Sequence, residues 1–222
     1  GLIPIKMYEY QKEITHLITD NRRVTVVTSR QAGKTTVAAA VILHYVLFNE
    51  HKLIALLANK GDSAREILDR IKIAYEALPK WLQQGVVEWN KGSVEFENGS
   101  KIVAAATSSS AIRGKSVSFL YIDESAFVEN WEEFSSAVLP TISSGKTTKT
   151  LYTSTPNGLN HFHKTCSGAK EGTNGFKFVE VPWQKVPGRD AEWKQETLAA
   201  MDFDTQKFAQ EYSCQFLGSS NT

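Results

Sequence analysis

Short apolar runs alternate with longer segments of helical character along this chain of 222 residues. Four runs rich in β-branched or aliphatic residues predict buried strands, at 24–27, 53–57, 119–122 and 150–153. Segments without Gly or Pro predict the helices between them, over 34–48, 63–78 and 132–139. Strands that alternate with helices imply βαβ units. The pattern therefore predicts an α/β fold with a central, mostly parallel sheet flanked by helices.

The remaining segments suggest a division of the chain. The first 20 residues predict a helix, and Ser63 with Glu66 predicts a capping box that opens the helix over 63–78. Three short runs joined by turn sequences predict antiparallel hairpins at about 86–105. The tail predicts a strand over 176–181 and helices near 191–201 and 205–212. We expect a core over 1–172 with a hairpin insertion, and a small helical subdomain over 173–222 that leads to a linker.

Charge and composition narrow the functional classes. The 25 basic and 24 acidic residues give a net charge of +1, so any contact with nucleic acid must be local or must use another domain. The longest nearly apolar stretch, 36–48, is too short to span a bilayer, and no secretory signal is visible at the start. The two cysteines form no zinc or disulfide pattern. These features predict a soluble cytoplasmic domain without a membrane partner.

The segment Thr-Ser-Arg-Gln-Ala-Gly-Lys-Thr at 28–35 matches the end of the phosphate-binding pattern GxxxxGK[ST], and Thr28 stands where the pattern has its first glycine. A predicted strand precedes it and a predicted helix follows, so backbone N–H groups at the helix start can surround phosphate oxygens. Lys34 would reach the β- and γ-phosphates, and the Thr35 hydroxyl would hold Mg²⁺. A chance Gly-Lys-Thr at a helix start is the alternative. The predicted nucleotide contacts in this segment are Ser29, Arg30, Gln31, Ala32, Gly33, Lys34, Thr35 and Thr36.

The apolar strand at 119–122 runs into two acids, Asp123 and Glu124, in the manner of a Walker B segment. Asp123 would bind the Mg²⁺ shell through water, and Glu124 would orient and deprotonate the attacking water. A strand that ends in an acidic loop is the structural alternative. The position of the pair about 90 residues after Lys34, within an α/β pattern, favours the catalytic interpretation.

Three segments, SRQAGKTT, FLYIDESAF and TSTPNGLNHF, together resemble the large terminase subunit of tailed bacteriophages, nearest its contractile-tailed branch. The resemblance covers essentially the whole chain but only the N-terminal ATPase half of that protein; its nuclease domain is absent. It implies a P-loop NTPase core of the additional-strand, catalytic-glutamate (RecA-like) type. It also implies that the strand ending at Thr153 lies between the two strands that carry the phosphate loop and the Asp-Glu pair.

The resemblance also suggests roles for single residues. Arg30 matches an arginine that senses the γ-phosphate, and Tyr10 and Gln11 match a segment that contacts adenine. The hydroxyl cluster of Thr153, Ser154 and Thr155 resembles the motif that couples hydrolysis to movement. Arg113 matches an arginine proposed to act in trans, and the Ser- and Ala-rich stretch at 104–111 before it predicts a flexible surface segment. Each of these residues also has a purely structural interpretation, as a loop, helix, strand-end or surface residue.

The resemblance implies Mg²⁺-dependent ATP hydrolysis that drives double-stranded DNA into a preformed capsid. The implied partners are DNA, the portal protein, the small terminase subunit and further copies of the chain in a ring, in the host cytoplasm and transiently on the procapsid. A helicase-like translocase is one alternative, but too few residues remain for a second lobe. A non-enzymatic assembly module is another, which the Asp-Glu pair disfavours. His161 and His163 alternate, yet no Cys or Asp cluster near them supports a metal site.

Overall fold

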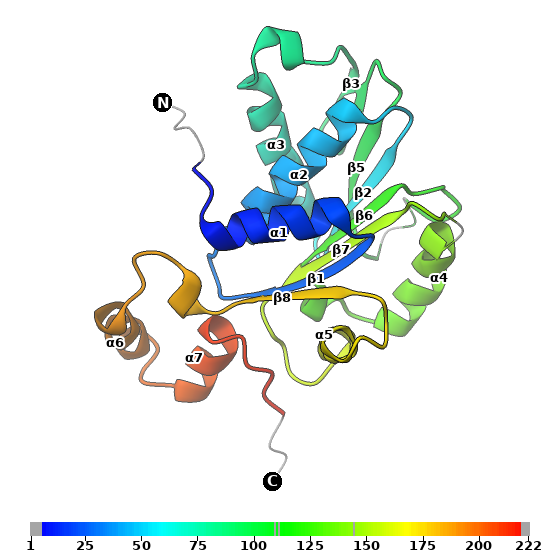
Figure 1. Cartoon of the computed structure of the whole chain (residues 1–222). Coiled ribbons are helices and arrows are strands. Elements are labelled where there is room, and N and C mark those ends of the chain that lie inside the picture. The colour runs from blue at the N-terminus through cyan, green and yellow to red at the C-terminus, as the bar shows by residue number, and fades with distance from the viewer. Residues whose placement is uncertain (1–5, 109, 111, 144, 219–222) are drawn as a thin grey trace.

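The computed structural model describes residues 6–108, 110, 112–143 and 145–218 (Figure 1). Seven α-helices lie in this part of the chain: α1 (Glu9–Asp20), α2 (Lys34–Phe48), α3 (Gly61–Glu76), α4 (Trp131–Ser143), α5 (His161–Glu171), α6 (Ala191–Ala200) and α7 (Thr205–Tyr212). Eight strands accompany them: β1 (Arg23–Thr28), β2 (Leu53–Ala58), β3 (Val86–Trp89), β4 (Ser93–Phe96), β5 (Lys101–Ala106), β6 (Phe119–Asp123), β7 (Lys149–Ser154) and β8 (Lys177–Val181). None of the described helices is long and apolar enough to cross a membrane.

All eight strands belong to one sheet with the order β3-β4-β5-β2-β6-β7-β1-β8. The six strands from β5 to β8 in this order run parallel, and β3 and β4 run antiparallel at one edge. The prediction that the strand ending near Thr153 lies between the other two motif strands is confirmed, because β7 pairs with both β1 and β6. In register, Thr153 faces Val26 on one side and Asp123 on the other. The carboxyl ends of these three strands therefore meet at one edge of the sheet.

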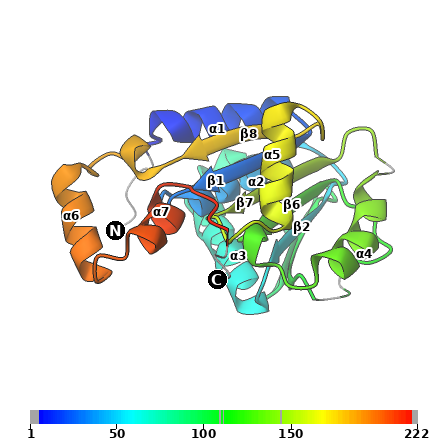
Figure 2. The same ribbon diagram turned by 90° about the horizontal axis from the view of Figure 1, so that it is seen from below.

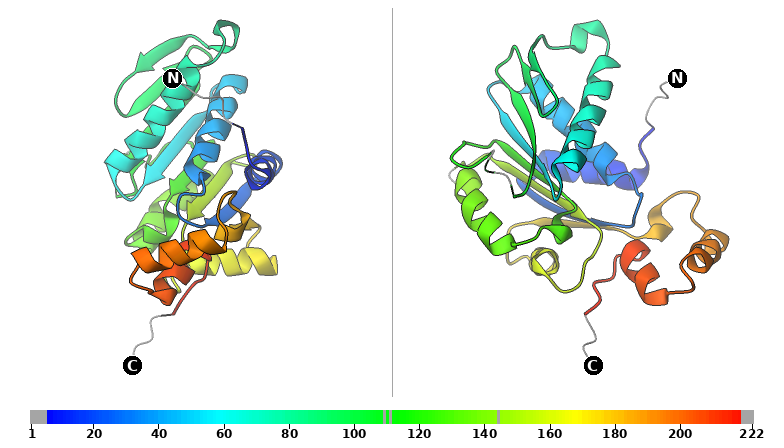
Figure 3. Two further views of the ribbon diagram at one scale, coloured as in Figure 1. Left: turned by 90° about the vertical axis from the view of Figure 1, so that its left-hand side faces the viewer. Right: turned by 180° about the vertical axis from the view of Figure 1, so that it is seen from behind.

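Helices cover both faces of the sheet, which is why its strands are apolar on both sides. Helices α1, α2 and α3 pack on one face, where Ile14, Ile42 and Leu68 join the core. Helices α4 and α5 pack on the other, where Val138 and Phe162 are buried (Figure 2). Helices α6 and α7 follow β8 and project to one side of the sheet, as Figure 3 shows from behind.

Two predicted boundaries change in the structure. Strand β5 pairs in parallel with β2, so the segment at 86–105 is not a separate hairpin insertion, and only β3 and β4 form an antiparallel edge. Strand β8 pairs with β1, so the sheet extends to Val181, beyond the boundary expected at 172. The helical part of the tail begins after this strand. The predicted linker residues 219–222 lie outside the described residues.

The predicted start of the third helix is also wrong. Helix α3 begins at Gly61 after Lys60, with no side-chain cap, and Ser63 lies inside its first turn. The Ser63–Glu66 pair therefore forms no capping box. At the N-terminal end the predicted helix is shorter than the first 20 residues, because α1 begins at Glu9, and residues 1–5 lie outside the described part of the chain.

Candidate active site

The loop between β1 and α2 has the conformation that a phosphate loop needs. Gly33 is the N-cap of α2 and is left-handed (φ 75°), and Gln31 also has a positive φ of 57°. A Cβ atom on Gly33 would lie 2.7 Å from Nε2 of Gln11, so both the backbone angle and the space require glycine. Thr28, by contrast, is the last residue of β1 and pairs with Val181. The missing first glycine therefore causes no strain, because the chain is still a strand at that position.

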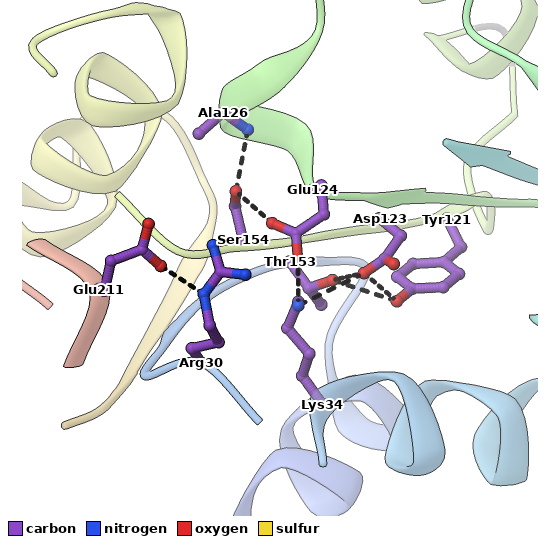
Figure 4. A network of polar contacts seen from close by, with 9 residues as sticks. All are labelled: Arg30, Lys34, Tyr121, Asp123, Glu124, Ala126, Thr153, Ser154 and Glu211. Carbon is purple, nitrogen blue, oxygen red and sulfur yellow. Dashed lines mark hydrogen bonds and ion pairs between the residues drawn. The ribbon is translucent and has the colours of Figure 1, made fainter. Parts of the chain in front are cut away.

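Lys34, Asp123 and Glu124 meet at the carboxyl end of the sheet (Figure 4). The Lys34 ammonium lies 2.5 Å from Oε1 of Glu124 and 4.0 Å from Oδ1 of Asp123. Asp123 Oδ1 also accepts hydrogen bonds from the Tyr121 hydroxyl at 2.9 Å and the Thr153 hydroxyl at 3.0 Å. Burial raises the pKa of Asp123; Glu124 adds to this rise, while the Lys34 ammonium opposes it. The site thus holds one buried carboxylate and one that is more exposed.

The hydroxyl cluster at the end of β7 contacts both acids. Thr153 bonds Asp123, as above, and the Ser154 hydroxyl donates to Oε2 of Glu124 at 3.2 Å. Ser154 also accepts a hydrogen bond from the backbone N–H of Ala126 at 3.2 Å, while Thr155 is buried beside them. A displacement of β7 would therefore be felt directly at both carboxylates.

The C-terminal helices bind the phosphate loop from outside. Nε of Arg30 donates to Oε2 of Glu211 at 2.6 Å, and its backbone N–H donates to the Glu211 carbonyl at 2.8 Å. The side-chain hydrogen bond raises the pKa of Arg30. Arg189 was not found from the sequence, yet its guanidinium donates to the Ser29 hydroxyl at 2.7 Å and the Arg30 carbonyl at 2.8 Å. It also lies 4.7 Å from the centre of the Trp193 ring. A lone arginine far along the chain gave no signal of this role.

Tyr10 and Gln11 lie against the same loop from the side of α1. The Tyr10 hydroxyl donates to the Ala32 carbonyl at 2.8 Å. The buried Gln11 side chain accepts from the Tyr8 backbone N–H at 2.9 Å, and its amide nitrogen faces Gly33. An open recess of about 560 Å³ adjoins them, and its lining consists mainly of Met7, Tyr8, Tyr10, Lys185 and Pro187. Aromatic and apolar walls of this kind can receive a flat base.

Arg113 lies apart from this centre. Its guanidinium is 3.8 Å from Oε1 of Glu133, both side chains are more than half exposed, and it borders a recess of about 210 Å³. The structure does not bring it into contact with Lys34, Asp123 or Glu124 within the described residues. The flexible segment predicted at 104–111 is partly wrong, because residues 104–106 belong to β5; Ser109 and Ala111 lie outside the described residues.

The donor chemistry at the centre fits Mg²⁺. This ion prefers one or two carboxylates together with waters and substrate phosphates over a cage made only of protein ligands. Asp123 supplies the carboxylate, and Thr35 supplies a hydroxyl in the first turn of α2. The described residues contain no group of three or more His, Cys, Asp or Glu side chains arranged around one point. His161 and His163 hydrogen-bond Ser125 and Ser167 respectively.

Comparisons with known proteins agree with this geometry. The family described as "terminase large subunit, T4likevirus-type, N-terminal" matches residues 25–222. The chain belongs to this family. The ATPase domain of the large terminase from Thermus phage P74-26 has the same fold, with a TM-score of 0.76, 22% identity, and coverage of 96% of this chain and 94% of that one.

Two longer solved terminases also share the fold of this terminase domain. The large terminase of bacteriophage HK97 gives a TM-score of 0.79 at 16% identity, covering 96% of this chain and 51% of that one. The large terminase of a thermophilic bacteriophage, in complex with ATP-γ-S, gives 0.76 at 11% identity, with coverage of 96% and 53%. The chain thus spans about half the length of these two proteins. Family and fold together make it a terminase ATPase domain.

Proposed function

We propose that this terminase domain hydrolyses ATP in a Mg²⁺-dependent reaction that drives double-stranded viral DNA into a preformed capsid. One observation supports this most strongly: Lys34, Asp123 and Glu124 converge beside a glycine-capped helix start. A positive charge, two carboxylates and free backbone N–H groups at one point are what phosphoryl transfer to water requires. Membership of the terminase family supplies the connection to DNA packaging.

The phosphate loop binds the nucleotide before any chemistry occurs. Backbone N–H groups of 31–36 surround the phosphates, and Ser29 supports the loop from below through its bond to Arg189. On ATP binding, Lys34 exchanges the Glu124 carboxylate for the β- and γ-phosphates. Asp123 and the Thr35 hydroxyl hold the Mg²⁺ shell. The ion neutralises charge on the phosphate oxygens when it is bound.

Hydrolysis then uses the freed Glu124 carboxylate as general base. It takes a proton from a water molecule whose oxygen attacks the γ-phosphorus, and the bond from that phosphorus to the bridging oxygen of ADP breaks. Arg30 senses the γ-phosphate in cis, and Arg113 supplies positive charge to the site of a neighbouring copy in a ring. Tyr10 and Gln11 contact the adenine.

The hydroxyl cluster connects this chemistry to movement. Thr153 and Ser154 each touch one of the two carboxylates, so a change in charge at the site alters their hydrogen bonds. This arrangement supports a coupling role for Thr153, Ser154 and Thr155. A net charge of +1 means that DNA contact must be local or must use another part of the protein.

The proposed partners are double-stranded DNA, the portal protein, the small terminase subunit and other copies of the chain. We place the domain in the host cytoplasm, docked transiently on the procapsid. The test is procapsid filling by a full-length large subunit with Glu124→Gln, beside ATP turnover by the domain in Mg²⁺ and in EDTA. Packaging without Glu124 would exclude the motor role. Absence of any Mg²⁺-dependent turnover would favour an assembly module, and unwinding of a forked duplex would favour a helicase.

A further inference from the structure

The turn that carries Glu124 is held in an uncommon conformation. Glu124 is left-handed, with φ 50° and ψ 46°, and the short 3₁₀ helix Ser125–Phe127 follows it. A residue with a side chain holds such angles only where its surroundings fix them, at a cost of about 1–3 kcal/mol. The position of the Glu124 carboxylate therefore depends on what binds this turn.

Side chains at the start of α5 supply that support. Nδ2 of Asn160 donates to the Ala126 carbonyl at 2.6 Å, and Nδ2 of Asn157 donates to the same oxygen at 3.2 Å. Nε2 of His161 lies 2.7 Å from the Ser125 carbonyl. Because a carbonyl can only accept, this nitrogen carries the hydrogen. Three donors from one short segment thus fix the two carbonyls that directly follow Glu124.

Two further contacts make this support rigid. The Asn160 side chain is also the N-cap of α5, since its Oδ1 accepts from the backbone N–H of Phe162 at 3.0 Å and of His163 at 3.4 Å. One planar amide therefore binds the helix with its oxygen and the Glu124 turn with its nitrogen. The His161 ring stacks on Trp131 at 4.2 Å between centroids and 5° between planes, which fixes its orientation.

We propose that Asn160 and His161 are positioning residues for Glu124. They hold the Ser125–Ala126 turn so that the carboxylate faces the attacking water, and they make the start of α5 part of the catalytic apparatus. Neither residue contacts Lys34 or Asp123 among the described contacts, so their effect is exerted through the turn. The inference rests on the proposed catalytic role of Glu124.

The test separates capping from positioning. Asn160→Ser keeps an oxygen that caps α5 but loses the donor to Ala126, because serine is a good N-cap with a shorter side chain. His161→Phe keeps the stack on Trp131 and loses the donor to Ser125. A misplacement of catalytic groups by about 1 Å costs on the order of 100-fold in rate. We expect each variant to lower kcat for ATP hydrolysis roughly 10- to 100-fold, while the Kd for ATP is maintained.

Asn174→Ser is the matched control. Its Nδ2 donates to the Thr165 carbonyl at 2.7 Å and its Oδ1 accepts from the Phe176 N–H at 3.1 Å, at the far end of α5. This variant loses the same kind of bond but should leave kcat unchanged. A fall in kcat of the same size as in Asn160→Ser would mean that general loosening of α5 explains both, and would overturn the inference.

A double-mutant cycle completes the test. If Asn160 acts through Glu124, then Asn160→Ser should have no further effect on turnover in a Glu124→Gln background. Fully additive losses, or a wild-type kcat in folded Asn160→Ser and His161→Phe proteins, would overturn the positioning role alone. Wild-type turnover by Glu124→Gln would instead overturn the proposed function, so the two failures are distinguishable.

Discussion

The ammonium group of Lys34 lies 2.5 Å from a carboxylate oxygen of Glu124, which joins the first residue of α2 to the turn after β6. In the proposed reaction neither group can act while this pair is intact. Lys34 must turn to the phosphates, and Glu124 must be free to accept a proton from water. ATP binding therefore has to break the pair, which keeps the base occupied until the substrate arrives.

Removal of Lys34 should affect binding and turnover together. Lys34→Ala deletes the only side-chain cation that the structure brings within 4.0 Å of both carboxylates among the described residues. We expect the Kd for ATP to rise roughly 10- to 100-fold, since hydrogen bonds to charged groups contribute about 1.5–3 kcal/mol each. Isothermal titration calorimetry measures this, with the exposed Lys12→Ala as control. Equal affinities in the two variants would remove Lys34 from the phosphate site.

Gln11 should discriminate between bases. Gln11→Glu keeps the oxygen that accepts from the Tyr8 N–H at 2.9 Å but loses the amide donor, so it tests base contact without loss of the helix start. We expect the KM for ATP to rise about 10-fold or more, with a much smaller rise for GTP, because the adenine edge loses its partner. Steady-state kinetics with both nucleotides decides the point. Equal changes for ATP and GTP would exclude contact with adenine.

Asp123 should make the nucleotide-free domain less stable at neutral pH. Burial raises the pKa of its carboxyl group, with a further contribution from Glu124, so the folded state holds the proton more tightly than the unfolded state. The free energy of unfolding then falls as the pH rises from the ordinary pKa of aspartate through the raised one. Asn at this position keeps an oxygen that can accept from Tyr121 and Thr153 but carries no charge.

Asp123→Asn should therefore raise Tm at pH 7 by a few degrees, since about 1 kcal/mol shifts Tm by roughly 2–4 °C in a domain of this size. The difference should shrink as the pH falls towards 4, where the native carboxyl is also neutral. Thermal melts across this range measure it, with Asp69→Asn as an exposed control. A lower Tm than wild type at pH 7 would show that ionised Asp123 stabilises the fold.

Arg113 should act on a neighbouring copy. Its half-exposed guanidinium contacts only Glu133 among the described ion pairs, at 3.8 Å. Arg113→Ala subunits keep an intact site without a finger, and Glu124→Gln subunits keep the finger with an inactive site. Mixed under conditions that form rings, the two should recover ATP turnover that neither has alone, since an arginine finger contributes on the order of 10³–10⁵ in rate. No recovery in confirmed rings would assign Arg113 a different role.

The sequence predicted the central strands and the first helix after the phosphate loop well, because each is an apolar run bounded by polar or turn residues. Helix α2 spans the predicted residues, and the strand at 119–122 differs from β6 only by Asp123. The motifs around Lys34 and Glu124 were also visible, since a short linear pattern defines them. Their convergence follows from the parallel order of β1, β7 and β6.

Pairings between distant segments were not visible in the same way. An isolated run such as 101–106 does not show whether its partner is a neighbouring hairpin or β2, and the structure gives it both. Side-chain networks were equally hidden. In the sequence Asn160 is an ordinary helix cap, and its second bond, to Ala126, depends on where the chain places a turn 34 residues earlier. Arg189 was missed for the same reason, because Ser29 lies 160 residues away.

The most direct test of the account is single-turnover ATP hydrolysis by Glu124→Gln with the protein in excess over nucleotide. The variant loses the general base and the charge that holds Lys34, but it keeps the phosphate loop. We predict that it binds ATP at least as tightly as wild type and that hydrolysis falls roughly 10²–10⁴-fold, the usual contribution of general-base catalysis. Hydrolysis at the wild-type rate would contradict the assignment of Glu124 as the catalytic base and, with it, the account of this site.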